Sequence, residues 1–77
     1  MLDVKAVGAK ISQIRKRNKM TQDDVAQKLF MSRQVVSKWE NGIALPSIET
    51  LIDLCELLNT TFDEILCLNN KERHNNE

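Results

Sequence analysis

The chain has 77 residues, with 11 Lys and Arg against 11 Asp and Glu, so its formal net charge is zero. This length allows one small domain, near the lower limit at which a hydrophobic core alone holds a fold. The longest uninterrupted apolar run covers only residues 65–68, so we expect no membrane span. No leader sequence is recognisable, and two cysteines without zinc-binding spacing indicate a reducing cytoplasm, no metal and no cofactor.

The charge is unevenly distributed along the chain. Up to Lys38 there are nine Lys and Arg against three Asp and Glu, a net charge of +6, and the remainder has a net charge of −6. One basic side that faces a polyanion and one acidic side would explain this polarity. Two solvated helix faces of opposite sign would also explain it, so charge alone leaves both interpretations open.

Apolar periodicity predicts five short helices and no strands. The first helix covers residues 4–18, and Gly8 is expected to interrupt it near its start. Thr21 caps the second helix in a capping box with Asp24. The positions expected to face the core in these two helices are Val4, Val7, Ile11, Ile14, Val25, Ala26 and Leu29.

Ser32 caps the third helix, which ends at Gly42 because Gly readily takes the left-handed conformation of a helix C-terminus. Ser47 caps the fourth helix, and Thr61 opens the fifth in a capping box with Glu64. The further positions expected to face the core are Met20, Met31, Val35, Val36, Trp39, Ile48, Leu51, Ile52, Cys55, Leu58, Phe62, Ile65 and Leu66.

These elements predict an all-α protein, a compact five-helix bundle that occupies residues 1–68 as one domain. Residues 69–77 are wholly polar and are expected to form a disordered tail. One His, no Tyr and no cluster of nucleophile, base or metal ligands argue against an enzyme.

Residues 22–41 combine a short helix, a turn of about three residues and a second short helix, which together form a helix-turn-helix. Ala26 is small enough for a steep crossing of the two helices, while Val36 and Trp39 would hold the second helix at a fixed angle. This recognition helix, about residues 33–40, would then present an outer face to the major groove of double-stranded DNA. The outward residues are Arg33, Gln34, Ser37 and Lys38.

The outward side chains have the chemistry to address a nucleic acid. Arg33 can donate two hydrogen bonds to guanine, and Gln34 can pair with adenine in the same bidentate manner. Gln22 and the open N-terminus of the second helix can hold a phosphate. The outer face carries no acidic residue before Glu40, which favours DNA over a merely solvated face.

The run TQDDVAQKLFMSRQVVSKWENG, followed by LPSIETLIDLCELLNTTFDEIL, resembles the Cro/phage-repressor (XRE) class of helix-turn-helix regulators over about residues 8–68. The resemblance implies a transcriptional regulator that binds a two-fold operator as a homodimer. Repression is the expected direction of control. It implies base contacts from the four outward residues and phosphate contacts from Gln22 and Asn41. It also implies that Arg15 pairs with Glu40.

Two positions depart from the family pattern. Phe30 occupies the turn position where Gly or Asn is usual, and a left-handed backbone there would be costly for a bulky residue. The first helix ends at Asn18 and Lys19, where the family often has Gly. Both departures could shift the geometry of the turns.

Leu68 is expected to be an exposed apolar residue at the end of the fifth helix and a contact of the homodimer. It could instead fold back onto Leu2 or Val4. A second functional interpretation is an antitoxin-type interaction module, which would grip a partner protein through the acidic half and bind its own operator. A restriction–modification control protein is a subtype of the DNA-binding interpretation that the sequence does not separate.

Overall fold

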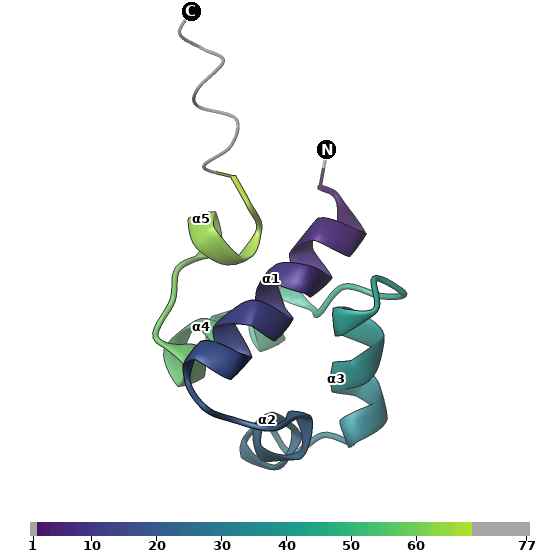
Figure 1. Cartoon of the computed structure of the whole chain (residues 1–77), viewed down its shortest axis with the longest axis vertical. Helices are drawn as coiled ribbons and strands as arrows, with labels where there is room; N and C mark the ends of the chain where they lie inside the picture. Colours follow the sequence, from purple (N-terminus) through teal and green to yellow (C-terminus); the bar gives the residue numbers. More distant parts are fainter. Residues whose placement is uncertain (1, 69–77) are drawn as a thin grey trace, which may run out of the picture.

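The computed structural model describes residues 2–68 and is all-helical over this range, as predicted (Figure 1). None of its helices has the length and apolar character needed to cross a membrane. The predicted disordered tail, residues 69–77, lies outside the described residues. The helices are α1 (Val4–Arg17), α2 (Gln22–Lys28), α3 (Arg33–Glu40), α4 (Ile48–Leu58) and α5 (Phe62–Ile65).

Side-chain caps begin the helices close to where the sequence predicts. Thr21 accepts a hydrogen bond from the backbone of Asp24 at 3.0 Å, and the Asp24 carboxylate accepts from the backbone of Thr21 at 2.8 Å, which is a complete capping box. Ser32 and Ser47 cap α3 and α4 with their hydroxyl oxygens, which accept hydrogen bonds from the backbone of Val35 and Thr50. These caps satisfy backbone donors that a helix leaves unpaired at its N-terminus.

The capping box predicted at Thr61 is only half formed, because one of its two expected hydrogen bonds is replaced by others. Thr61 does cap α5, but the Glu64 carboxylate accepts hydrogen bonds from the Thr60 hydroxyl at 2.6 Å and from Arg17 at 3.0 Å. The hydrogen bonds from Arg17 and Thr60 lower the pKa of Glu64 to about 2. Glu64 therefore ties α5 to the end of α1 instead of closing its own helix N-terminus.

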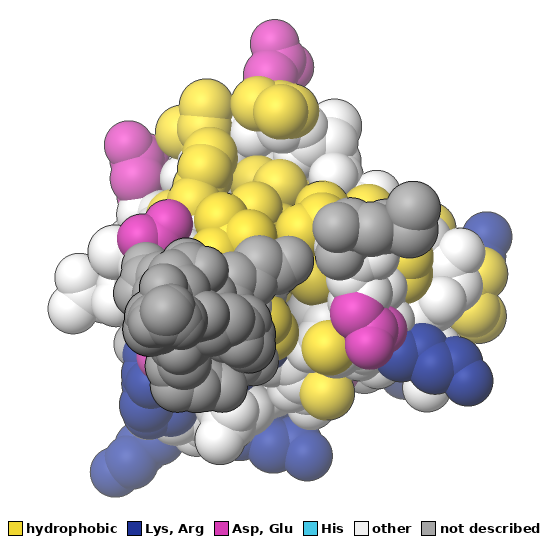
Figure 2. All heavy atoms as spheres, turned by 90° about the horizontal axis from the view of Figure 1, so that it is seen from above, with side chains coloured by type: hydrophobic (Ala, Val, Ile, Leu, Met, Phe, Trp, Pro, Cys, Tyr) yellow, Lys and Arg dark blue, Asp and Glu magenta, His cyan; other side chains and the backbone are white. Residues whose placement is uncertain are grey.

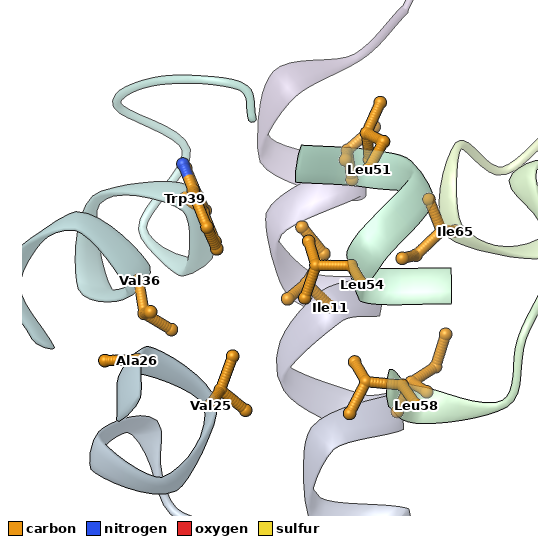
Figure 3. Packing of buried hydrophobic residues seen from close by; sticks show 11 residues of the cluster. Ile11, Val25, Ala26, Val36, Trp39, Leu51, Leu54, Leu58 and Ile65 are labelled. Atoms are coloured by element: carbon orange, nitrogen blue, oxygen red, sulfur yellow. The ribbon is translucent and has the colours of Figure 1, made fainter. Parts of the chain in front are cut away.

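The core lies between two groups of helices, with α1 in the middle. Figure 3 shows side chains of α2 and α3 pointing across Ile11 toward those of α4 and α5. The buried apolar residues are Val7, Ile11, Ile14, Val25, Ala26, Val36, Trp39, Leu51, Leu54, Leu58 and Ile65.

The predicted inner face of α4 is wrong in part. Ile48 and Ile52 are 69% and 46% exposed, whereas Leu54, which was not assigned to the core, is fully buried. The helix carries two adjacent apolar stripes, and only the stripe of Leu51, Leu54 and Leu58 faces the core. Periodicity alone could not choose between them because both have helical spacing.

Two further predicted core positions are also exposed. Phe62, the first residue of α5, and Met31, in the turn before α3, are each 37% exposed. Both lie at the edge of a short helix, where one turn cannot point every apolar side chain inward.

Gly8 does not interrupt α1, contrary to the prediction. The helix runs through this residue, which is buried and packs against the C-terminal turn of α3. A Cβ atom at position 8 would collide with the carbonyl oxygen of Trp39 and would lie 3.0 Å from that of Glu40. Glycine is therefore required here by the close approach of two backbones.

We expect Gly8→Ala to lower the free energy of unfolding by about 3 kcal/mol, because the collision is with backbone that cannot rotate away. Helix propensity alone predicts the opposite, a gain of about 1 kcal/mol. Urea unfolding of both proteins measures the difference, and the matched control is Ala9→Gly at the exposed neighbouring position, which should cost about 1 kcal/mol. A more stable Gly8→Ala protein would contradict the close approach.

Candidate nucleic-acid interface

The predicted helix-turn-helix is formed by α2 and α3. Figure 1 shows α2 nearly end-on beside α3, so the two helices cross steeply. Ala26 lies at this crossing with 1% of its surface exposed, and its carbonyl oxygen accepts a hydrogen bond from the backbone of Met31 at 2.8 Å. Val36 and Trp39 are buried against the core and fix the orientation of α3.

The turn between these helices is left-handed at Phe30, whose φ is 58°. Lys19, in the turn after α1, has a φ of 60°. The backbone at both departures from the family pattern thus keeps the conformation that Gly would take most easily. The left-handed backbone at Lys19 and Phe30 costs about 1 kcal/mol or more of strain at each residue. Because the Phe30 side chain is 95% exposed, no packing contact of comparable size offsets its strain.

The outer face of α3 presents the four predicted base-contacting residues together. Arg33, Gln34 and Lys38 are exposed and Ser37 is half-buried. Positions 33, 34, 37 and 38 are neighbours on a helix surface, so these side chains form one continuous strip. Within residues 2–68, neither of the two ion pairs engages Arg33 or Lys38, which leaves their charges available to a polyanion.

Arg15 pairs with Glu40, as the family resemblance implies. Nε of Arg15 lies 2.7 Å from Oε2 of Glu40, and Nη2 lies 3.0 Å from Oε1, in a bidentate arrangement. The remaining Nη1 donates to the carbonyl oxygen of Met20 at 2.8 Å. The pair is almost fully buried and connects α1, the turn before α2 and the last residue of α3.

Gln22 joins this network, which sequence reasoning did not predict. Its Nε2 donates to Oε1 of Glu40 at 3.0 Å, and no sequence spacing signals a contact between residues 18 positions apart. Burial raises the pKa of Glu40, but the hydrogen bonds from Arg15 and Gln22 outweigh it, so the pKa is lowered and the carboxylate stays ionised.

The network also fixes how Gln22 could reach a phosphate. A phosphate oxygen only accepts hydrogen bonds, and the amide nitrogen of Gln22 has one N–H in use and a second that remains free to donate. Asn41, the other predicted phosphate contact, is exposed at the end of α3. Its amide donates to the carbonyl oxygen and the hydroxyl of Ser37 at 2.9 and 3.1 Å.

The outer strip of α3 carries basic and amide side chains, which are groups that can donate hydrogen bonds to DNA. Among residues 2–68 there is no group of three His, Cys, Asp or Glu side chains that could hold a metal ion. A rigid helix pair with a free basic and amide-bearing strip defines the class of helix-turn-helix DNA-binding proteins. The chain belongs to the helix-turn-helix family of the XRE type, whose model matches residues 11–65.

Two relatives are similar in sequence to most of this chain. The HTH-type transcriptional activator BcrR of Enterococcus faecalis is 37% identical over 57 residues, and the ImmF control region 10 kDa protein of Bacillus phage phi105 is 44% identical over 59 residues. The matched segments cover 74% and 77% of this chain. They span 28% of the activator and 66% of the phage protein.

Solved structures share the fold. The clp gene regulator ClgR from C. glutamicum matches with a TM-score of 0.78 at 25% identity, over 87% of this chain and 86% of that one. The restriction-modification controller protein C.AhdI from Aeromonas hydrophila matches with a TM-score of 0.75 at 21% identity, over 82% and 96% of the two chains. The second likeness concerns the fold alone.

We expect Phe30→Asn to raise the free energy of unfolding by about 1 kcal/mol, because Asn tolerates the left-handed backbone and the exposed ring contributes little packing. Thermal and urea unfolding measure the gain. Phe62→Asn is the matched control, because this ring is more than half covered and its loss should destabilise the protein. If both variants are destabilised, the expectation that the exposed Phe30 ring contributes little packing is wrong.

Glu40→Leu should cost about 3 kcal/mol of stability, because it leaves the Arg15 guanidinium buried without its counter-charge. The double variant Arg15→Met/Glu40→Leu should recover part of this loss, since no unpaired charge remains. Urea unfolding of the two single variants and the double variant gives the coupling free energy. Additive losses would show that the two side chains do not stabilise each other.

Proposed function

We propose that the protein binds double-stranded DNA sequence-specifically, with α3 in the major groove. The observation that carries this proposal is the outer strip of α3, where Arg33, Gln34 and Lys38 are exposed on a helix fixed by buried Val36 and Trp39. The strip supplies bidentate donors for guanine and a matching amide for adenine. Gln22 and Asn41 are the proposed phosphate contacts, and their hydrogen bonds to Glu40 and Ser37 place both of them at the C-terminal end of α3.

Discrimination between sequences rests on these few residues. The net charge of the chain is zero, so the attraction to DNA that is independent of sequence is weak. Nine of the eleven Lys and Arg residues lie in the half of the chain that contains α1 to α3, which would orient this half toward the DNA. Occupation of an operator by such a protein is sufficient for repression, which is the direction of control that we propose.

The active form is proposed to be a homodimer on a two-fold operator. Its recognition helices would enter successive major grooves about 34–36 Å apart. Leu68, the predicted dimer contact, is half-buried, and α4 and α5 expose three further large apolar side chains. They are Ile48 and Ile52 on α4 and Phe62 on α5, which packs against α4.

These exposed side chains have the composition of a protein interface. Ile48, Ile52 and Phe62 are 69%, 46% and 37% exposed. Hydrophobic side chains also gather on the face of the molecule that Figure 2 shows, with charged side chains of both signs at the margin. Exposed apolar patches of this kind on small proteins mark association sites. A self-complementary contact through Ile48, Ile52 and Phe62, with Leu68 at its edge, would join two copies around a two-fold axis.

Arg33→Ala and Gln34→Ala should each relax the preference at one base position and cost about 1–3 kcal/mol of specific binding free energy. Selection of bound duplexes from a random pool, followed by titration of the selected duplex at several salt concentrations, measures both effects. Gln13→Ala, at an exposed position on α1, is the matched control and should leave the selected sequence unchanged. If both α3 variants select the wild-type sequence, the assigned readout is wrong.

Ile52→Glu should raise the dissociation constant of the homodimer at least tenfold, about 1.4 kcal/mol, because it places a charge in the proposed apolar contact. Sedimentation equilibrium measures the mass, and circular dichroism confirms that the exposed substitution leaves the fold intact. Phe30→Asn is the control, because it removes an exposed ring elsewhere and should leave the mass unchanged. A monomeric wild-type protein would overturn the dimer itself, whereas an unaffected Ile52→Glu dimer would overturn only this interface.

A further inference from the structure

One exposed side chain is not explained by the fold or by DNA binding. Phe30 is 95% exposed in the turn of the helix-turn-helix, on a left-handed backbone with φ of 58°. A large aromatic ring in water forgoes its hydrophobic stabilisation, and the backbone adds strain. Any stabilisation that this ring provides must come from something that covers it.

Phe30 forms one wall of an open groove between the turn and α4. The groove has a volume of about 430 Å³ and is lined by Lys28, Leu29, Phe30, Asp53, Glu56 and Leu57. Leu29 and Leu57 are half-buried and form an apolar floor. The groove therefore offers an aromatic wall and an aliphatic base that one apolar side chain from outside could fill.

The rim of the groove is acidic. Asp53 and Glu56 lie three positions apart on α4, so both carboxylates project from the same side of the helix, and both are exposed. Neither takes part in the ion pairs found within residues 2–68, and Lys28 is the one basic residue in the lining. A Lys or Arg side chain placed against this rim would be attracted by both carboxylates, and its charged group could also lie over the face of the Phe30 ring.

The groove is separate from both surfaces of the proposed function. None of the four base-facing residues of α3 lines it. Around α4, Ile48 and Ile52 project from one flank, while Asp53 and Leu57 project from the other, as the 100° step between helix residues requires. A ligand in the groove would therefore leave the DNA-reading strip and the proposed dimer contact uncovered.

We propose that this groove docks a segment of a second protein that combines an apolar side chain with adjacent Lys or Arg residues. The two carboxylates against one Lys in the lining disfavour a nucleic acid as the occupant, and the exposed ring and the aliphatic side chains disfavour a purely polar basic segment. The two carboxylates of the rim come from α4, in the acidic half of the chain, whereas Lys28, Leu29 and Phe30 come from the basic half, so the groove lies where the two halves meet. The site would allow the DNA-bound regulator to recruit or be controlled by this partner.

Selection of a phage-displayed library of random 12-residue peptides tests the proposal. Peptides that bind the Phe30→Asn variant are removed first, and the remaining peptides are selected on the full-length protein. The expected result is enrichment of peptides with an aromatic or large aliphatic residue beside Lys or Arg. A synthetic peptide from this pool, titrated into ¹⁵N-labelled protein, should shift the amide resonances of Leu29, Phe30 and Leu57. Failure to enrich peptides that depend on Phe30, or enrichment of peptides without Lys and Arg, overturns the proposal.

Substitutions in the rim sharpen the test. Phe30→Asn and the double variant Asp53→Asn/Glu56→Gln should each weaken binding of the synthetic peptide at least tenfold, while operator binding stays unchanged. The matched control is Glu49→Gln/Asp63→Asn, which neutralises two exposed carboxylates outside the groove and should leave the peptide affinity unchanged. Equal weakening of peptide binding by the control variant, or resonance shifts centred on Ile48 and Ile52, would overturn the proposed docking site. So would occupation of the groove by a second copy of the chain or by residues 69–77.

Discussion

The close packing of α1 against the last turn of α3 is the constraint on which the rest of the structure depends. At one point Gly8 brings the two backbones together over the carbonyl groups of Trp39 and Glu40. Two turns further along α1, Arg15 forms its buried bidentate pair with Glu40. The two contacts prevent α3 from sliding or rotating, because one tolerates no added atom and the other requires both partners. The proposed reading of a groove by the outer strip of α3 depends on the inner side of the helix being held in this way.

The same joint extends to the start of α2 through Gln22. Glu40 accepts hydrogen bonds from Arg15 and Gln22, so one carboxylate fixes the end of the recognition helix and the side chain proposed to meet a phosphate. The proposed phosphate contact and the proposed recognition helix are thereby held in one geometry. This arrangement costs burial of a charge, which the guanidinium and amide donors compensate.

The sequence predicts the local structure well and the tertiary contacts unevenly. Helix positions, the caps at Thr21, Ser32 and Ser47, and the helix-turn-helix follow from short-range rules, because the groups that satisfy a helix end are close in sequence. The family resemblance correctly implied the class of protein. The role of Gly8 was missed because a local rule treats glycine as a helix breaker, whereas a contact with residues more than 30 positions away decides its use here.

The errors on α4 have one physical cause and show what that helix does. Seven of its eleven residues are apolar, which is more than one inner face can bury, and spacing alone cannot tell which apolar stripe faces the core. The fold buries Leu51, Leu54 and Leu58 and leaves Ile48 and Ile52 outside. The acidic residues Glu49, Asp53 and Glu56 then form a ridge between this exposed stripe and the groove at Phe30. α4 belongs to the half of the chain with net charge −6, where like charges disfavour a polyanion, whereas the strip proposed to contact DNA belongs to the half with net charge +6.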